Sequence, residues 1–181
     1  MEQKRVGIMT GKEFMNSVAN GQVDILQQFL DLLNEMKIDY CVIGGLAVNA
    51  YAEPVVSLDL DIVVVADAIE KLIKAAEKMF TVKKFPHSLN LESHLSELRI
   101  QLQTDQRYQH FIGKATSKKV MGYEMKVALL EDVLRGKIWA YSDDQRRKSK
   151  RQKDLADIFR LVEAYPSLKD ILPDSIKRTG I

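Results

Sequence analysis

The sequence predicts an α/β fold: a small mixed β-sheet flanked by helices, with a helical C-terminal portion. Short β-prone runs alternate with helical patterns up to about residue 128, whereas residues 129–181 are mostly helical in pattern. The β-branched run within Ser57–Val65 is continuous, which is typical of a central strand buried on both faces. We therefore expect an α/β core in residues 1–128 and, packed on it, a helical extension in residues 129–181.

The composition is that of an ordinary folded chain. Hydrophobic residues make up 46% of the 181 residues and charged residues 29%, which argues against a disordered or collagen-like protein. Cys41 is the single cysteine, so no intramolecular disulfide forms, and we expect it to be buried in a strand. No apolar run approaches the roughly 20 residues that span a bilayer, and Met1–Gly11 lacks the apolar core of a signal peptide. We expect a cytoplasmic protein.

The first predicted elements are two helices. Thr10 followed by Glu13 is a capping-box signature, and it predicts a short helix to Val18. Apolar side chains recur at helical spacing through residues 22–37, which predicts one amphipathic helix there.

A strand, a glycine turn and a second strand come next. Tyr40–Ile43 is a β-prone run that ends in Gly44-Gly45, after which Leu46–Tyr51 is compatible with a helix. The central strand Ser57–Val65 follows this helix.

The middle of the chain continues the alternation. We expect a helix over residues 67–79 capped by Asp67, a strand over Phe80–Phe85, and a loop over Pro86–Ser96 because that stretch is polar and lacks clear periodicity. From Leu98 to Gln103 apolar and polar residues alternate, which predicts a strand whose polar face looks toward solvent or a cleft.

The last third is predicted to be mainly helical. Asp105 begins an expected helix to Ala115, and the residues around Gly122 predict a hairpin. The formal net charge of +2 is too small to indicate nucleic-acid binding, but six of the eleven residues from Asp143 to Lys153 are basic, inside a helical pattern. This local basic run is the main electrostatic feature of the sequence.

Asp59 and Asp61 are the strongest candidates for chemistry. In a strand, residues two apart leave the same face about 7 Å from each other, so both carboxylates can converge on one ion. Two facing carboxylates repel each other unless a cation lies between them, and Mg²⁺ is the usual partner of oxygen ligands and substrate phosphates. The alternative is a pair of solvent-facing aspartates at a strand end.

The glycine turn adds a second part of the same site. Gly44 and Gly45 allow a ligand to approach the backbone closely and present amide donors at the start of a helix. The stretch from Ile43 to Tyr51, followed by Ser57–Val64, resembles the signature of the nucleotidyltransferase superfamily with the DNA polymerase β-like fold. The resemblance implies that the turn, with Ser57 near it, contacts a nucleoside triphosphate. It also implies that the aspartates bind catalytic Mg²⁺ or Mn²⁺.

The resemblance extends into the C-terminal portion. Gly136–Ala140, Arg146-Arg147 and Lys150–Asp157 look like the helical region of toxin-type and abortive-infection-type bacterial nucleotidyltransferases. This implies a catalytic role for Lys137, nucleotide contacts from Lys150, Lys153 and Asp154, and an antitoxin as partner. In physical terms these lysines can screen a triphosphate and the aspartates can orient them. The alternative is a solvated, charged helix face.

Two positions depart from the family pattern. Val55 stands where family members often carry an arginine, which removes a phosphate contact. Gln101 stands where the third carboxylate belongs, and a glutamine is neither a charged ligand nor a base. Glu97 and Asp105 are each four residues from Gln101, about 13 Å along a strand, too far to replace it.

Two hypotheses remain open. The first is a metal-dependent enzyme that moves a nucleoside monophosphate from a nucleoside triphosphate to a hydroxyl on RNA, protein or a small molecule. The second is a catalytically impaired module of the same fold that binds nucleotide or nucleic acid, which would explain Gln101. We favour the first because it accounts for the glycine turn and both aspartates. Tyr108, Phe111 and Trp139 are interpreted as core residues.

Overall fold

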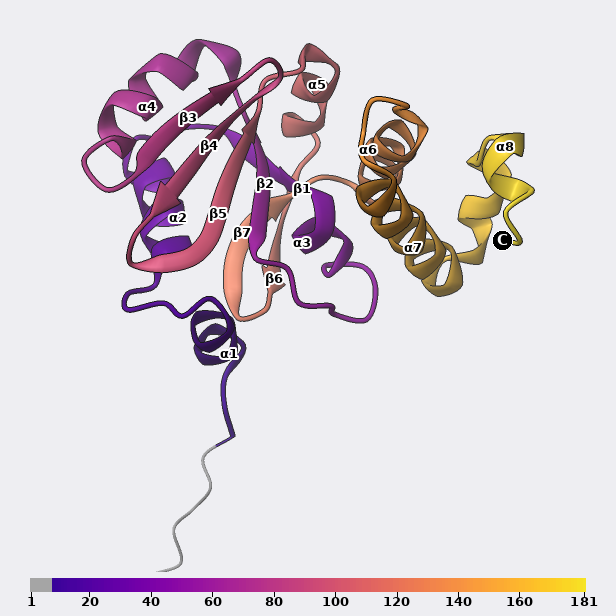
Figure 1. Ribbon diagram of the computed structural model, residues 1–181, viewed down its shortest axis with the longest axis horizontal. Coiled ribbons are helices and arrows are strands. Elements are labelled where there is room, and N and C mark those ends of the chain that lie inside the picture. The colour runs from indigo at the N-terminus through magenta and orange to yellow at the C-terminus, as the bar shows by residue number, and fades with distance from the viewer. Residues whose placement is uncertain (1–7) are drawn as a thin grey trace, which may run out of the picture.

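The computed structural model describes residues 8–181 and shows one seven-stranded mixed sheet with helices on both sides (Figure 1). Residues 1–7, which belong to the segment expected to hold no signal peptide, lie outside the described residues. The strands are β1 (Tyr40–Ile43), β2 (Asp59–Val64), β3 (Thr81–Phe85), β4 (Ser88–Ser93), β5 (Ser96–Gln103), β6 (Thr116–Val120) and β7 (Tyr123–Val127). The helices are α1 (Gly11–Val18), α2 (Ile25–Glu35), α3 (Gly44–Val48), α4 (Ile69–Ala76), α5 (Gln109–Ile112), α6 (Leu130–Ser142), α7 (Lys148–Ala164) and α8 (Asp174–Lys177). The predicted α/β fold is confirmed.

The order of the strands places β2 in the middle of the sheet. The order is β3-β4-β5-β2-β1-β7-β6, with β2 antiparallel to β1 and parallel to β5. Cys41 is fully buried in β1, as expected. The hairpin of β6 and β7 turns at Met121-Gly122, and both residues have the positive φ that such a tight turn requires.

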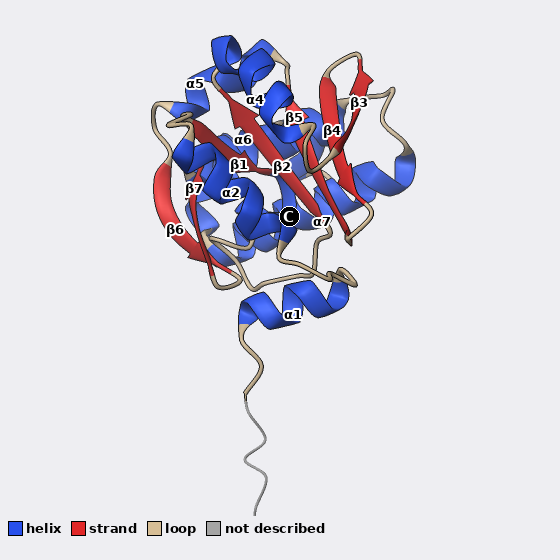
Figure 2. Cartoon of the chain, turned by 90° about the vertical axis from the view of Figure 1, so that its left-hand side faces the viewer, coloured by secondary structure: helices blue, strands red, loops and turns tan. Residues whose placement is uncertain are grey.

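The two faces of β2 differ in polarity near the start of the strand. Helices α2 and α4 lie on one side of it, and α6 and α7 lie on the other (Figure 2). Leu60 and Ile62 of β2 are fully buried, whereas Asp59 and Asp61, which point to the opposite face, are partly exposed. The core therefore fills one face of β2, and the carboxylates are directed at the other.

Three expectations about local structure were wrong. The predicted loop over Pro86–Ser96 contains β4, whose alternation of Leu89 and Leu91 with polar residues is short and follows a two-residue turn. The predicted helix from Asp105 is a 3₁₀ turn, Gln106–Tyr108, followed by the single-turn α5, although Asp105 does cap it. The first part of the basic run, residues 143–147, lies in the loop between α6 and α7 instead of in a helix.

The other helix boundaries shift by a few residues. The capping box of Thr10 and Glu13 is present at α1. Asp67 does not cap its helix with its side chain; it lies in a 3₁₀ turn, Ala66–Ala68, before α4. The bounds of the helices and strands do not define domains, so the division into a core of residues 1–128 and an extension of residues 129–181 stays a prediction. No helix in residues 8–181 is long and apolar enough to cross a membrane.

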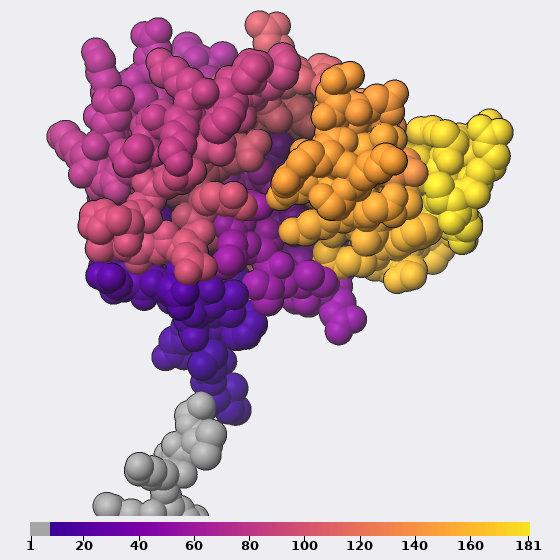
Figure 3. All heavy atoms as spheres, in the orientation of Figure 1, coloured from indigo at the N-terminus to yellow at the C-terminus, as the bar shows by residue number. Residues whose placement is uncertain are grey.

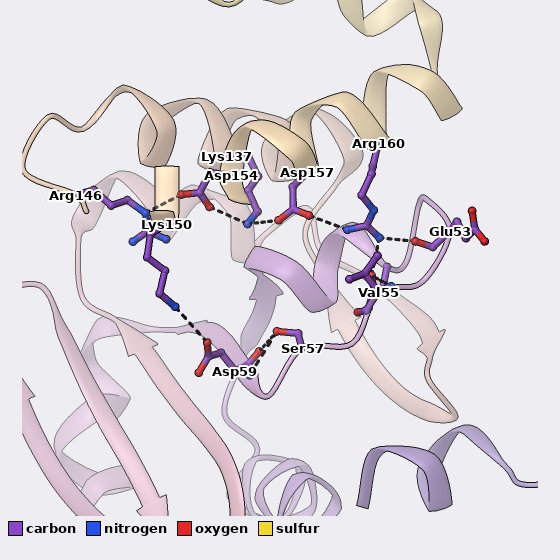
Figure 4. Close-up of polar contacts among 11 residues, drawn as sticks. Glu53, Val55, Ser57, Asp59, Lys137, Arg146, Lys150, Asp154, Asp157 and Arg160 are labelled. Atoms are coloured by element: carbon purple, nitrogen blue, oxygen red, sulfur yellow. Dashed lines mark hydrogen bonds and ion pairs between the residues drawn. The ribbon is translucent and has the colours of Figure 1, made fainter. Parts of the chain in front are cut away.

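Arg160 ties helix α7 to the loop that leads into β2. Its guanidinium pairs with Asp157 at 2.7 Å, donates to Asn49 Oδ1 at 2.8 Å and also donates to the Glu53 carbonyl (Figure 4). Asn49 in turn holds Val55 through hydrogen bonds in both directions, of 2.7 and 3.0 Å. Because the arginine side chain is only 19% exposed, water is a poor substitute for these partners.

We expect Arg160→Met to lower the free energy of unfolding by about 2 kcal/mol, since buried acceptors on two elements lose a charged donor. Urea unfolding followed by circular dichroism measures the change. Lys148→Met, an exposed substitution on the same helix, is the control and should be nearly neutral. Equal midpoints for the two variants would show that Arg160 does not hold the loop.

Candidate functional site

The strand register brings Gly44, Asp61 and Gln101 together. Ile43, immediately before the glycine turn, is the antiparallel partner of Asp61, and Gln101 of β5 is its parallel partner on the other side. By the same register Asp59 lies beside Arg99. The expected proximity of the glycine turn to the aspartates is confirmed.

Gly44 has to be a glycine. Its φ is +68°, and a Cβ at this position would lie 2.8 Å from Cγ of Asp61. At Gly45 a Cβ would be 3.3 Å from Ser57 Oγ, a tight but less severe contact. The missing side chains let the Asp61 carboxylate lie directly against the turn.

Ser57 shapes the start of β2. Its hydroxyl donates to the Asp59 carbonyl at 3.3 Å, and the Asp59 amide approaches the same oxygen at 3.4 Å. Ser57 is buried beside Gly45 and therefore links the turn to the strand that carries the carboxylates.

All site residues expected from the sequence line one cleft between the sheet and helices α6 and α7. Figure 3 shows the surface hollowed along this boundary. On the sheet side lie Gly44, Gly45, Ser57, Asp59, Asp61 and Gln101, and on the helical side lie Lys137, Lys150, Lys153 and Asp154. Acidic groups thus face basic groups across the cleft.

Two cations pair with Asp59. Arg99 approaches one carboxylate oxygen at 2.8 Å, and Lys150 approaches the other at 3.8 Å from the far wall of the cleft. The Asp59 side chain is 23% exposed and those of Arg99 and Lys150 are 53% and 37% exposed, so both pairs are in contact with solvent and readily exchanged.

Asp61 lies deeper than Asp59. Burial raises the pKa of the Asp61 carboxyl; Lys137 opposes the shift, and the charge of Asp59 adds to it. The raised pKa means that the protein around Asp61 does not fully compensate its negative charge. A further cation near this carboxylate would stabilise the ionised form.

Lys137 is the centre of a buried ionic network. Its ammonium group lies 3.0 Å from Asp154 Oδ1 and 2.6 Å from Asp157 Oδ2, and Arg146 binds the other oxygen of Asp154 at 2.7 Å (Figure 4). Burial alone would lower the pKa of Lys137, but the carboxylates of Asp157 and Asp154 outweigh it and raise the pKa. Lys137 is therefore a fixed cation at neutral pH.

Gln101 lies beside Asp61 where a third carboxylate was expected from the resemblance, and neither Glu97 nor Asp105 replaces it. The Glu97 carboxylate accepts a hydrogen bond from Asn20, and Asp105 caps a 3₁₀ turn and pairs with Arg107. Within residues 8–181, no three His, Cys, Asp or Glu side chains gather as a metal-binding group. A divalent ion in this cleft would have two carboxylate ligands from the chain.

Several residues that line the cleft were not expected from the sequence. Asp132, Val133 and Gly136 of α6 line it beside Lys137, and the Asp132 side chain is buried, with one oxygen held by Arg135 at 2.7 Å. Tyr108, interpreted as a core residue, also lines the cleft, although its ring packs on Phe111 as expected. Asp132 and Gly136 are four residues apart and therefore share a face of α6, a signal that could have identified them.

The fold resembles those of solved nucleotidyltransferases. The chain is similar to ANT(2'')-Ia in complex with adenylyl-2''-tobramycin, with 14% identity over 88% of this chain and 99% of that chain and a TM-score of 0.60. It is similar to the lincomycin-bound lincosamide antibiotic adenylyltransferase LnuA, with 15% identity over 78% of this chain and 99% of that chain and a TM-score of 0.55. An antigenic nucleotidyltransferase-like protein from Paracoccidioides brasiliensis is 21% identical over 82% of this chain and 75% of that chain, with a TM-score of 0.52. The chain therefore has the nucleotidyltransferase fold.

Neither a protein-family model nor a curated protein matches the sequence.

Arg99 competes with any cation for Asp59, so Arg99→Gln should tighten Mn²⁺ binding by about threefold, the effect of one half-exposed ion pair. Isothermal titration calorimetry measures the dissociation constant. Arg107→Gln removes the same charge from a residue whose partner is Asp105, and it should leave the constant nearly unchanged. Weaker Mn²⁺ binding by the Arg99 variant would contradict a metal position at Asp59.

Proposed function

We propose that this chain is a metal-dependent nucleotidyltransferase, which moves a nucleoside monophosphate from a nucleoside triphosphate to a hydroxyl acceptor. The observation that supports it most is the Asp61 carboxylate lying against the Gly44 turn, with Asp59 beside it and a cationic wall opposite. This arrangement offers oxygen ligands, backbone amides and positive charge to one polyphosphate.

The two carboxylates fit one Mg²⁺ or Mn²⁺ ion. Asp59 and Asp61 extend from the same face of β2, and the missing Cβ of Gly44 leaves room at Asp61. Mg²⁺ in such sites keeps water and phosphate ligands besides one or two carboxylates, so two are enough for one ion. When bound, the ion would neutralise charge on the triphosphate and on the departing pyrophosphate.

The basic residues have two different tasks in this proposal. Lys150 and Lys153 extend from α7 into the cleft, where they can neutralise the phosphates. Lys137 and Asp154 are bound to each other, so Lys137 acts as a fixed positive charge near Asp61 and Asp154 holds it in place. Because its pKa is raised, Lys137 stays protonated and does not serve as the base.

The reaction balances without a further reactant. The acceptor oxygen forms a bond to the α-phosphorus, the bond from that phosphorus to the bridging oxygen breaks, and pyrophosphate leaves with the electron pair. The hydroxyl proton passes to solvent or to the pyrophosphate. Positioning and charge neutralisation contribute most of the acceleration in such phosphoryl-type transfers.

The second candidate is a module that binds nucleotide or nucleic acid without turnover. Gln101 at the third-carboxylate position favours it, because no side chain there can deprotonate the acceptor. RNA, a protein or a small molecule as acceptor, an antitoxin as partner and a cytoplasmic location stay predictions from the sequence.

A nucleoside triphosphate with Mg²⁺ should raise the melting temperature by about 5 °C at saturating ligand, because a ligand that binds only the folded state stabilises it. The double variant Asp59→Asn, Asp61→Asn should lose this shift. Asp67→Asn, Asp170→Asn changes the charge equally at exposed positions outside the cleft and should keep it. Differential scanning fluorimetry measures the melting temperatures. An unchanged shift in the Asp59→Asn, Asp61→Asn variant would rule out these carboxylates as the metal site.

Gln101→Asp should separate the two candidates. A third carboxylate beside Asp61 should tighten Mg²⁺ binding about tenfold and raise the transfer of labelled nucleotide, since it adds a ligand and a base. Repulsion between the carboxylates should also make this variant less stable in chelator, with recovery on adding Mg²⁺. If the parent already transfers nucleotide and the variant loses that activity, the neutral amide has a positive role and the impaired module is wrong.

A further inference from the structure

A row of polar side chains continues from the carboxylates across the uncovered face of the sheet. Asp61 is the register partner of Gln101, Gln101 of Asn90, and Asn90 of Lys83. Directly opposite residues in paired strands point to the same face. The amides of Gln101 and Asn90 therefore extend the floor of the cleft outward from the metal position.

The rows on either side of this one are also polar. Asp59, Arg99 and Glu92 form the row before it, and Gln103 and Ser88 the row after it. The alternate residues of β4 and β5, such as Leu91 and Ile100, are fully buried against the other layer. Helices α2 and α4 cover that apolar face, and no helix of residues 8–181 lies on the polar face of β4 (Figures 1 and 2).

Asn90 and Gln101 have unused hydrogen-bonding capacity. Asn90 Oδ1 is buried and has no partner among residues 8–181. A buried oxygen without a donor costs about 1–3 kcal/mol, and a ligand hydroxyl that reached it would recover that cost. Within the same residues, no hydrogen bond of the Gln101 side-chain amide is found, and Gln101 lines the cleft.

Two further neutral groups border this floor. Gln103 Oε1 accepts from the Asp105 amide at 3.2 Å, which leaves its NH₂ group for a ligand. Tyr108 lines the cleft with its ring held edge-on by Phe111 and Trp139, at centroid distances of 5.3 and 5.2 Å. Burial raises the pKa of Tyr108 to about 12, so its hydroxyl stays protonated and can donate.

Outward from Asp61, the charged side chains of this face are paired with each other. Arg99 is bound to Asp59, and Glu92 is bound to Lys83 at 2.6 Å. Lys150 and Lys153, which line the cleft, repel a polycation. Apart from Asp61 at the proposed metal position and Asp132 on α6, the described residues of the cleft and floor offer a multiply charged aminosugar no unpaired carboxylate, whereas an uncharged sugar finds amides that both donate and accept.

We propose that the face formed by Asn90, Gln101 and Gln103 is the acceptor subsite, and that it takes the hydroxyls of an uncharged sugar and not those of a polycationic aminosugar. The inference rests on the proposed transfer reaction, in which it makes Asn90 a specificity-determining residue. The sugar is either free or the terminal ribose of an RNA, because both present the same neutral hydroxyls.

Side-chain amide resonances test the subsite directly. In ¹⁵N-labelled protein the NH₂ signals of Asn90 and Gln101 are assigned from Asn90→Asp and Gln101→Glu. Titration with D-ribose, lactose and a short RNA with a free 3′ end, each to its solubility limit, should shift these signals for at least one probe. A response to the RNA alone identifies the polymer as the source, and a response to the free sugars identifies a small molecule. Tobramycin should leave them in place.

Asn90→Asp supplies the converse measurement. The carboxylate introduced at residue 90 should reduce the shift of the Gln101 NH₂ signal on titration with the neutral probes. It should also tighten tobramycin binding about tenfold, the effect of one charge-assisted hydrogen bond. Asn34→Asp makes the same charge change at an exposed position of α2, on the other side of the sheet, and should change neither. Circular dichroism and the melting temperature confirm that both variants fold.

The subsite is overturned if no neutral probe shifts either amide, or if tobramycin shifts them in the parent protein. Neither result depends on turnover. If the protein binds Mg²⁺ and nucleoside triphosphate but its side-chain amide signals do not shift, only the acceptor subsite is wrong. If the amide signals shift but nucleotide does not raise the melting temperature, the sugar-binding face is supported and the proposed transferase function is wrong.

Discussion

The repulsion between Asp59 and Asp61 is the constraint around which the rest of the structure is arranged. Two carboxylates leave the same face of a central strand, and the protein offsets their charge from three directions. Arg99 lies beside Asp59 on β5, Lys150 reaches Asp59 from α7, and Lys137 acts on Asp61 from α6. The helices are held at the distance this requires, because Asp154 and Asp157 of α7 bind Lys137 while Arg160 fastens the same helix to the loop before β2. The charge of Asp61 is incompletely compensated, and the proposed metal ion would complete the compensation.

The parts of the site that are close in the chain could be predicted from the sequence. Gly44-Gly45 and the two aspartates lie on consecutive strands, and the pairing of neighbours in sequence is the commonest arrangement in a sheet. The expected position of Gln101 on a strand beside Asp61 is confirmed, because the alternation from Leu98 to Gln103 fixes which side chains share a face. Which residues of a strand share a face depends only on their spacing in the sequence, so this prediction holds even where the rest of the topology is predicted wrongly.

The parts that depend on contacts between distant segments could not be predicted. Strand β4 looks like a loop in the sequence because its polar residues lie on the same sheet face as Gln101 and only Leu89 and Leu91 mark its apolar side. Nothing in the sequence around Arg99 indicates that it lies beside Asp59, because that contact depends on the register between β2 and β5. Lys137 was singled out as a catalytic cation, but the sequence gives no sign that it is buried between two aspartates. In each case the missing information is which strand or helix lies opposite.

In the proposed transfer reaction, a glutamine in place of a third carboxylate would affect both the metal ion and the acceptor. A third carboxylate beside Asp61 would add negative charge to a position where burial already disfavours it, and the chain instead places a neutral amide there. In the proposed transfer reaction the site would then lack a base and a third metal ligand, so the acceptor hydroxyl would have to be presented to the α-phosphorus largely by positioning. Positioning needs a surface that forms several hydrogen bonds with the acceptor without adding charge near the metal. The amides of Gln101 and Asn90 have this property, and they lie in one register row with Asp61. In the proposed reaction, the glutamine that cannot act as a base would therefore extend the floor on which a neutral acceptor is aligned.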